Sequence, residues 1–165
     1  MSIVSDIEKL KKEKNAVILA HYYVDEDVQD IADYIGDSFY LSKVATKVDQ
    51  DRIIFAGVEF MGESAKILNP DKRVFMPDMN ADCPMAHMAD KDEILKLREE
   101  YDDLAVVCYI NSTAELKKYS DVCVTSSNAV KIVKNLPNKN IFFIPDRNLG
   151  HFVAKQCPDK NFIFN

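Results

Sequence analysis

The sequence predicts an α/β fold made of repeated three-layer α/β/α units with short parallel sheets. Short apolar runs alternate with stretches of helical periodicity along the whole chain of 165 residues. This alternation is typical of βαβ units, in which helices connect parallel strands. The chain has only four glycines and no Gly/Ser-rich linker, and the same apolar pattern occurs twice. We therefore expect two similar units joined without a flexible connection.

The expected elements follow from the periodicity of the apolar residues. Residues 1–14, MSIVSDIEKLKKEK, have the pattern of an amphipathic helix. The expected strands are the short apolar runs at 16–20, 52–56, 73–76, 104–108, 121–125, 141–144 and 161–164. Helical patterns lie between them, at 27–34, 38–48, 60–68, 86–100, 113–119, 127–135 and 148–156.

A shift of 88 residues realigns the apolar pattern without a gap. The segment AVILAHYY falls on LAVVCYIN, YIGDSFYLSKV on VCVTSSNAVKI, and IIFAGVEFMG on IFFIPDRNLG. Few identities accompany the match, Asp33 with Asp121 among them, but the strand starts and the polar strand ends coincide. The pattern predicts two equivalent units, 1–88 and 89–165. Under the same shift RVFMPD falls on the C-terminal residues, so we expect the second unit to be truncated after its last strand.

Composition excludes several classes of partner. The formal net charge is −6, whereas binding to nucleic acid or to an anionic membrane surface needs clustered Lys and Arg. No apolar run approaches the ~20 residues of a membrane span. The charged N-terminal helix does not have the pattern of a signal peptide. We therefore expect a cytoplasmic protein with neither nucleic acid nor membrane as partner.

The four cysteines do not form a C-x-x-C pair, and disulfides are not expected in a cytosolic chain. Cys108 and Cys123 lie in apolar runs and are expected to be small buried hydrophobic residues. Cys157 lies in a polar turn, where we expect an exposed thiol. Cys83 precedes Pro84, a suitable first helical residue, and free N–H groups there would favour a thiolate. The local sequence leaves open whether Cys83 is functional or incidental.

Polar side chains follow two of the expected strands. His21 and Tyr23 come after 16–20, and Tyr109 and Asn111 come after 104–108. Side chains two residues apart on an extended segment point to the same side. Ligands of open parallel sheets bind beyond the carboxyl ends of the strands. Each pair can therefore face one ligand.

Two serines are expected to open the helices that follow. Ser38 and Ser126 are candidate N-caps, and they can be plain caps or can hold a carboxylate or phosphate together with free N–H groups. His21 has two interpretations as well. Its imidazole can be a satisfied structural group, or it can be a ligand or proton donor.

Four segments carry a resemblance to a known family. They are LAHYYVDEDVQDIADYIGDS, FAGVEFMGESAKILNPDKRVFMPDMNADCPMA, VCYINSTAELKKYSDVCVTSSNAVKIV and FIPDRNLGHFVA. In order and without large gaps, they resemble the signature segments of quinolinate synthase, from about residue 14 to the C-terminus. The resemblance implies three similar α/β units around a pseudo-threefold axis, of which this chain would hold two. The active site would lie where the three units meet.

The resemblance also implies a reaction. The family condenses iminoaspartate with dihydroxyacetone phosphate to quinolinate, with loss of phosphate and water, in de novo NAD biosynthesis. L-aspartate oxidase or aspartate dehydrogenase would supply the iminoaspartate. The residues carried over as substrate-binding are His21, Tyr23 and Ser38 in the first unit and Tyr109, Asn111 and Ser126 in the second. His21 and Tyr109 would also be catalytic, the tyrosine as a group that transfers a proton.

The cofactor implied by the resemblance is a [4Fe-4S] cluster with one cysteine ligand from each unit. Cys83 in ADCPMA matches the first ligand, and the open iron would act as a Lewis acid. The family's two other ligands and the His, Thr and Glu residues of its third unit have no counterpart here. We therefore expect the isolated chain to be inactive and, with apolar surface uncovered, to aggregate or oligomerise. The alternatives are a non-catalytic substrate-binding or assembly module and a cluster-free α/β enzyme acting on a phosphosugar.

Overall fold

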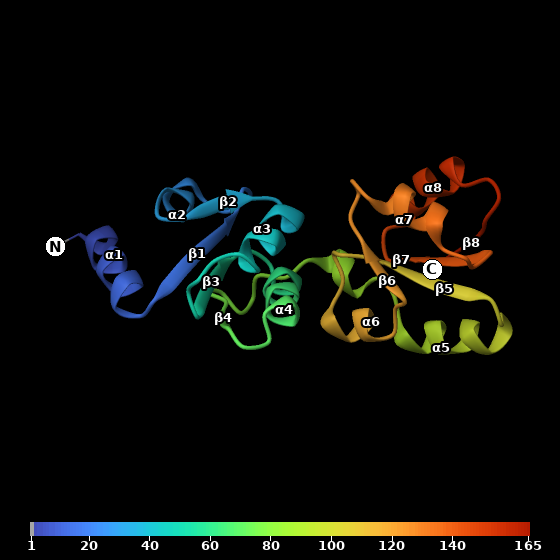
Figure 1. The fold of residues 1–165 in the computed structure, drawn as a ribbon, viewed down its shortest axis with the longest axis horizontal. Helices are drawn as coiled ribbons and strands as arrows, with labels where there is room; N and C mark the ends of the chain where they lie inside the picture. Colours follow the sequence, from blue (N-terminus) through green and yellow to red (C-terminus); the bar gives the residue numbers. More distant parts are fainter. Residues whose placement is uncertain (1) are drawn as a thin grey trace. The chain divides into compact units, whose positions relative to one another are not determined.

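The computed structural model describes residues 2–165. The chain divides into two compact units, Met1–Asp82 and Cys83–Asn165, and each has one four-stranded sheet (Figure 1). Every strand pair is parallel, which confirms the predicted α/β class with short parallel sheets. The unit boundary predicted from the repeat, between 88 and 89, remains a prediction. Among residues 2–165, no helix combines the length and the apolar character that a bilayer crossing requires.

The described residues of the first unit, 2–82, form four helices and four strands. In chain order they are α1 (Ile3–Glu13), β1 (Ala16–His21), α2 (Glu26–Asp30), β2 (Tyr34–Gly36), α3 (Ser38–Ala45), β3 (Arg52–Ala56), α4 (Glu59–Leu68) and β4 (Arg73–Phe75). The strand order in the sheet is β2-β1-β3-β4.

The second unit begins with a short 3₁₀ helix and then repeats this series. Its elements are η1 (Pro84–His87), α5 (Lys91–Glu100), β5 (Leu104–Tyr109), α6 (Ala114–Lys118), β6 (Val122–Val124), α7 (Ala129–Asn135), β7 (Asn140–Ile144), α8 (Arg147–Gln156) and β8 (Asn161–Phe164). The strand order is β6-β5-β7-β8, equivalent to that of the first unit.

The structure confirms the 88-residue repeat down to strand register. β1 and β5 begin 88 residues apart, and Ala16 pairs with Arg52 as Leu104 pairs with Asn140. α4 and α8 show the same offset. The N-terminal helix also belongs to the repeat, because α1 and α5 begin 88 residues apart. The two units therefore share the same order of helices and strands.

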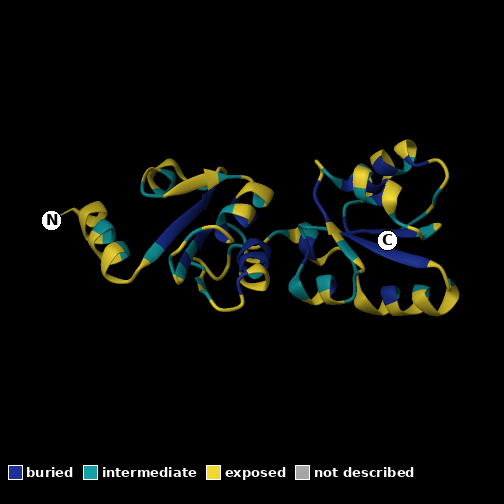
Figure 2. Ribbon diagram, in the orientation of Figure 1, coloured by how far each residue is buried: buried dark blue, intermediate teal, exposed yellow. Residues whose placement is uncertain are grey.

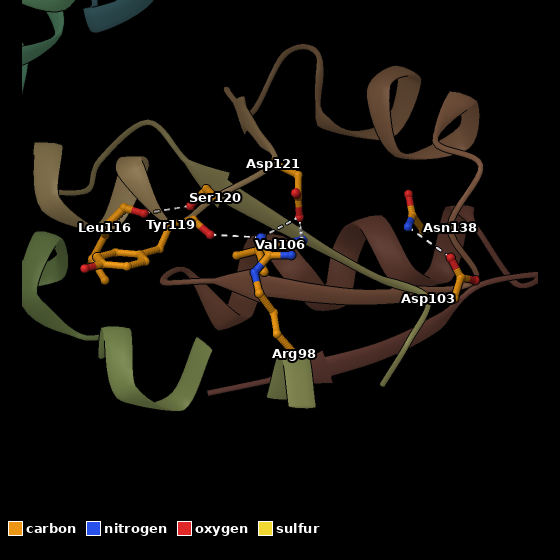
Figure 3. A network of polar contacts seen from close by, with 8 residues as sticks. All are labelled: Arg98, Asp103, Val106, Leu116, Tyr119, Ser120, Asp121 and Asn138. Carbon is orange, nitrogen blue, oxygen red and sulfur yellow. Dashed lines mark hydrogen bonds and ion pairs between the residues drawn. The ribbon is translucent and has the colours of Figure 1, made fainter. Parts of the chain in front are cut away.

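One equivalent pair of aspartates shows how closely the units agree. The Asp33 carboxylate accepts a hydrogen bond from the Ile18 N–H at 2.8 Å. The Asp121 carboxylate accepts one from the Val106 N–H at 2.7 Å and pairs with Arg98 at 2.9 Å (Figure 3). In each unit the aspartate lies just before the edge strand. Its carboxylate accepts a hydrogen bond from a backbone N–H group of β1 or β5 that the edge strand is too short to pair with.

Strand β2 was not predicted. The helical pattern expected over 27–34 ends at Asp30, and Tyr34–Gly36 forms a three-residue edge strand. A run this short has no measurable alternation, so only the repeat could have indicated it, through the predicted strand at 121–125. The helical pattern over 86–100 is likewise interrupted, because the Asp90 carboxylate accepts a hydrogen bond from the Asp92 N–H and starts a new helix.

Helices cover both faces of the second unit's sheet (Figures 1 and 2). On one face, Ala105, Val107 and Phe143 pack against residues of α7 and α8. On the other face, Val106 and Cys108 pack against residues of α5 and α6. Alternate residues of β5 therefore face different helix layers, and this arrangement produces the fully apolar strand seen in the sequence.

Two cysteine predictions are wrong. The Cys157 side chain is buried in the α7/α8 layer, because the turn that ends α8 folds back onto the core. Its burial raises the pKa of its thiol. Cys123 is exposed, because β6 is an edge strand. For Cys108 the prediction is confirmed, since its side chain is 0% exposed.

The fourth residue of α4 and of α8 is a glycine that lets the helix approach the sheet. A Cβ added to Gly150 would lie 2.7 Å from a Phe164 ring carbon and 3.0 Å from one of Phe143. The three atoms nearest to a Cβ added to Gly62 all belong to the Met76 side chain, with its sulfur at 2.3 Å. The two close approaches therefore differ in the stiffness of the neighbouring side chain.

We expect Gly150→Ala to destabilise the protein and Gly62→Ala to be close to neutral. Overpacking against rigid rings costs about 1–3 kcal/mol, which exceeds the gain of up to ~1 kcal/mol in helix propensity. The flexible Met76 side chain can move aside instead. Urea unfolding of the two matched variants gives the comparison, and equal losses of stability would contradict it.

Candidate functional site

His21 is the last residue of β1 and is 7% exposed. Its Nδ1 accepts a hydrogen bond from the Tyr23 N–H at 3.2 Å, and its ring stacks on that of Tyr22 at 4.5 Å between centroids. Burial lowers the pKa of the imidazole, against a smaller raising effect of the Asp37 carboxylate. The imidazole is therefore neutral at pH 7, and with Nδ1 as acceptor its proton resides on Nε2. This nitrogen is a hydrogen-bond donor.

Tyr23 lies beside His21, in a turn and not in the extended segment that the sequence analysis assumed. The two rings make an edge contact, with centroids 4.7 Å apart, and Tyr23 is 82% exposed. Tyr22 lies in the same group, and a hydrogen bond with Tyr23 raises its pKa. The carboxyl end of β1 thus carries an imidazole and two phenols in mutual contact.

Ser38 is not the N-cap that the sequence predicted. It is the first residue of α3, and the cap is Asp37, whose carboxylate accepts a hydrogen bond from the Tyr40 N–H at 2.7 Å. Aspartate is as good a cap as serine, so local sequence could not rank the two. The Asp37 charge also lowers the attraction of this helix terminus for a second anion.

In the second unit, Tyr109 ends β5 and Asn111 follows two residues later. The Oδ1 atom of Asn111 is buried and has no hydrogen-bond partner among residues 2–165. Ser112, which the sequence reasoning missed, is 0% exposed and donates to the Tyr109 carbonyl at 2.8 Å. Since a buried polar atom without a partner costs about 1–3 kcal/mol, the Asn111 acceptor is the strongest sign of a ligand in this unit.

Ser126 is likewise not a cap. It is exposed in the turn after β6, and the N-cap of α7 is Asn128, whose Oδ1 accepts a hydrogen bond from the Thr125 N–H at 2.7 Å. Helix α7 therefore starts later than the repeat predicts. Thr125, which was also missed, contacts Ser127 through a hydroxyl–hydroxyl hydrogen bond of 2.9 Å. A polar residue directly after a strand was the available signal.

Cys83 lies at the N-cap position of η1, and Pro84 is the first helical residue, as predicted. Its side chain is partly exposed and is not in a disulfide. Helix η1 has four residues, which is too short for a large helix dipole. Within residues 2–165 no three His, Cys, Asp or Glu side chains lie close enough to hold a metal ion. Among the described residues, Cys83 therefore offers one partly exposed thiol and is not part of a complete set of metal ligands.

The lowered pKa of His21 predicts a pH dependence of stability. A histidine with a pKa below its ordinary value of 6.5 contributes stability that is complete above pH 6.5 and decreases as the pH falls toward the folded-state value. We expect His21→Gln to reduce the loss of unfolding free energy on acidification. Urea titrations above and below pH 6.5 measure this, with His87→Gln at an exposed position as the control. An unchanged slope in the His21 variant would contradict the prediction.

The fold places the chain among parallel α/β proteins, whose ligands bind at the carboxyl ends of strands. The chain belongs to the quinolinate synthetase A protein family, whose family model matches residues 5–165. This confirms the resemblance seen in the sequence. The His21 and Tyr109 strand ends both lie within the matched region.

Three curated relatives, all named quinolinate synthase, are similar over nearly the whole chain. The protein of Fusobacterium nucleatum is 65% identical over 159 residues, that of Clostridioides difficile 56% over 158, and that of Caldicellulosiruptor saccharolyticus 55% over 161. These matches cover 96%, 96% and 98% of the chain and 53%, 52% and 53% of the relatives. The chain thus spans about half the length of these relatives.

Proposed function

We propose that this chain is the N-terminal part of a quinolinate synthase, which condenses iminoaspartate with dihydroxyacetone phosphate. The products are quinolinate, phosphate and water, and the reaction serves de novo NAD biosynthesis in the cytoplasm. Family membership over residues 5–165 supports the assignment. The observation that supports a binding site is the buried Asn111 Oδ1 near the carboxyl end of β5, an acceptor with no hydrogen-bond partner in the described part of the chain.

The proposed roles follow from the donors and acceptors at the strand ends. The His21 Nε2–H donates to a carboxylate or carbonyl oxygen of the substrate, and its neutral state avoids a tight ion pair. The Asn111 Oδ1 accepts from a substrate N–H or O–H. Tyr109 moves a proton at its phenol oxygen during the condensation. The hydroxyls of Tyr23, Ser38 and Ser126 orient the carboxylates and the phosphate.

Cys83 would be one of three cysteine ligands of a [4Fe-4S] cluster. When bound, such a cluster supplies a Lewis-acidic iron that assists loss of water. The other two ligands would come from outside these 165 residues. We therefore propose that the isolated chain is inactive. L-aspartate oxidase or aspartate dehydrogenase would supply the unstable iminoaspartate.

A non-catalytic substrate-binding or assembly module is the second candidate. The observation behind it is the buried Asn111 acceptor, which can bind a substrate donor with no cluster present. Such a module would keep the His21 and Asn111 contacts and bind substrate carboxylates without converting them.

A complementation assay separates the two. The chain would be mixed without oxygen with the C-terminal half of the Fusobacterium relative, together with iron, sulfide and both substrates. Formation of quinolinate by the mixture, its absence with either part alone, and its loss with Cys83→Ser support the synthase. Cys123→Ser is the matched control and should retain activity. If the mixture binds dihydroxyacetone phosphate but forms no quinolinate and no cluster, the assignment falls to the binding module.

A further inference from the structure

Cys108 and Cys123 are direct neighbours in the second unit's sheet. They are register partners on the adjacent parallel strands β5 and β6. Cys108 faces the α5/α6 layer, whereas Val122 and Val124 contact the opposite layer, so Cys123 lies on the same face as Cys108. Neighbouring strands lie about 4.7–4.9 Å apart, within the Cα separation of about 4.4–6.8 Å that a disulfide spans. The expected Cα separation of the two cysteines is therefore one that a disulfide can span.

The two thiols also influence each other's pKa. A hydrogen bond from Cys123 lowers the pKa of Cys108 to about 7, against the raising effect of burial. Ser112, Ser120 and Lys117 contribute further in the same direction, and α5 presents the apolar Ile94 to this face. The same hydrogen bond, followed by burial, raises the pKa of Cys123. The pair thus loses its first proton near neutral pH, although protonated Cys108 can donate to the Tyr109 carbonyl at 3.4 Å.

The two cysteines differ in access. Cys108 is 0% exposed, whereas Cys123 is exposed on the edge strand β6. A reagent in solution therefore reaches Cys123 first, and Cys108 lies behind it. Redox-sensing cysteines are accessible and lie next to a second cysteine that resolves the mixed disulfide. Here Cys123 is the accessible cysteine, and Cys108 is the neighbour that can resolve it.

We propose that Cys108 and Cys123 form a reversible disulfide, made by exchange with an oxidised low-molecular-weight disulfide such as glutathione disulfide. The Cys123 sulfur attacks one sulfur of the reagent and passes its proton to the Cys108 thiolate, while one glutathione thiolate leaves. Cys108 then loses this proton to water, and its sulfur attacks Cys123 and displaces the second glutathione. In sum, two protein thiols are oxidised to one disulfide, and one glutathione disulfide is reduced to two glutathione thiols.

The disulfide would join β5 and β6 one residue before Tyr109 and Val124, where both strands end. It would therefore hold the strand ends at the Asn111 side of the second unit in one relative position. The proposal rests on the two cysteines alone and does not depend on the reaction proposed above.

The test is to incubate the reduced chain with mixtures of oxidised and reduced glutathione, quench with acid and digest with protease. We expect a Cys108–Cys123 crosslinked peptide, loss of two hydrogen atoms from the intact mass, and full reversal by excess reduced glutathione. The rate of closure should rise with pH through about 7, the pKa of the pair.

Matched variants make the outcome decisive. Cys123→Ser should remain reduced at Cys108 and gain no glutathione there, because Cys108 is out of reach. Cys108→Ser, if folded, should stop at a stable mixed disulfide on Cys123. Stable glutathione on Cys123 in the unaltered chain, or a disulfide that involves Cys83 instead, would overturn the proposal. The same holds if Cys123 stays reduced in fully oxidised glutathione.

Discussion

Replacing Phe143 with alanine is expected to lower the free energy of unfolding by about 3–5 kcal/mol, the usual cost of removing a fully buried aromatic ring. Phe143 lies in β7 and is 0% exposed. Its ring is in the α7/α8 layer, where Gly150 approaches closely. The loss is large against the 5–15 kcal/mol by which a typical domain is stable.

Urea unfolding measures the loss of unfolding free energy. Faster amide hydrogen exchange in β5 would show that this part of the sheet is the part destabilised. Phe152→Ala is the matched control, since this ring lies on α8 and is 53% exposed. A substitution at such a site should change stability by no more than about 0.5 kcal/mol. Comparable losses for Phe143→Ala and Phe152→Ala would mean that the α7/α8 layer is not the core of this unit.

The repeat explains why much of the fold was predictable. Seven strands were expected from apolar runs, and each is present with ends within two residues of the prediction. A long buried strand such as β5 is easily predicted from the sequence, because the residues on both of its faces are apolar. Strand β2 was missed because three residues at a sheet edge carry no periodic signal. Its counterpart β6 was predicted correctly. The repeat would therefore have predicted β2 as well, but residues 27–34 were interpreted from their local pattern alone.

The candidate site was less predictable, because it depends on contacts rather than on residue types. The sequence associated His21, Tyr23, Tyr109 and Asn111 with the correct strands, although His21 and Tyr109 are the last residues of β1 and β5 and do not follow them. It could not show that His21 is buried with Nδ1 as acceptor. The N-cap residues of α3 and α7 could not be predicted from the local sequence either, because several residues that can cap a helix lie next to each other at each helix start. The exposure of a cysteine depends on which strand is at the edge, and the sequence alone does not give the strand order.

Asp121→Ala is the second substitution with a large expected effect, about 1.5–3 kcal/mol of unfolding free energy. The Asp121 carboxylate accepts a charge-assisted hydrogen bond from the N–H of Val106, a residue that is 0% exposed (Figure 3). Alanine would leave this backbone donor in β5 without its acceptor. The cost arises from the unmet donor rather than from the ion pair with Arg98, whose side chain is 35% exposed.

Two matched variants separate these contributions. Arg98→Ala removes the ion pair and the bond from Arg98 to the Tyr119 carbonyl, 3.0 Å long, and should cost no more than about 1 kcal/mol. Asp121→Asn keeps an oxygen that can accept from Val106, so its cost should fall between those of the two alanine variants. Hydrogen exchange at the Val106 amide should accelerate most in Asp121→Ala. If Arg98→Ala destabilises as much as Asp121→Ala, the ion pair and not the backbone hydrogen bond is what holds β5 at this point.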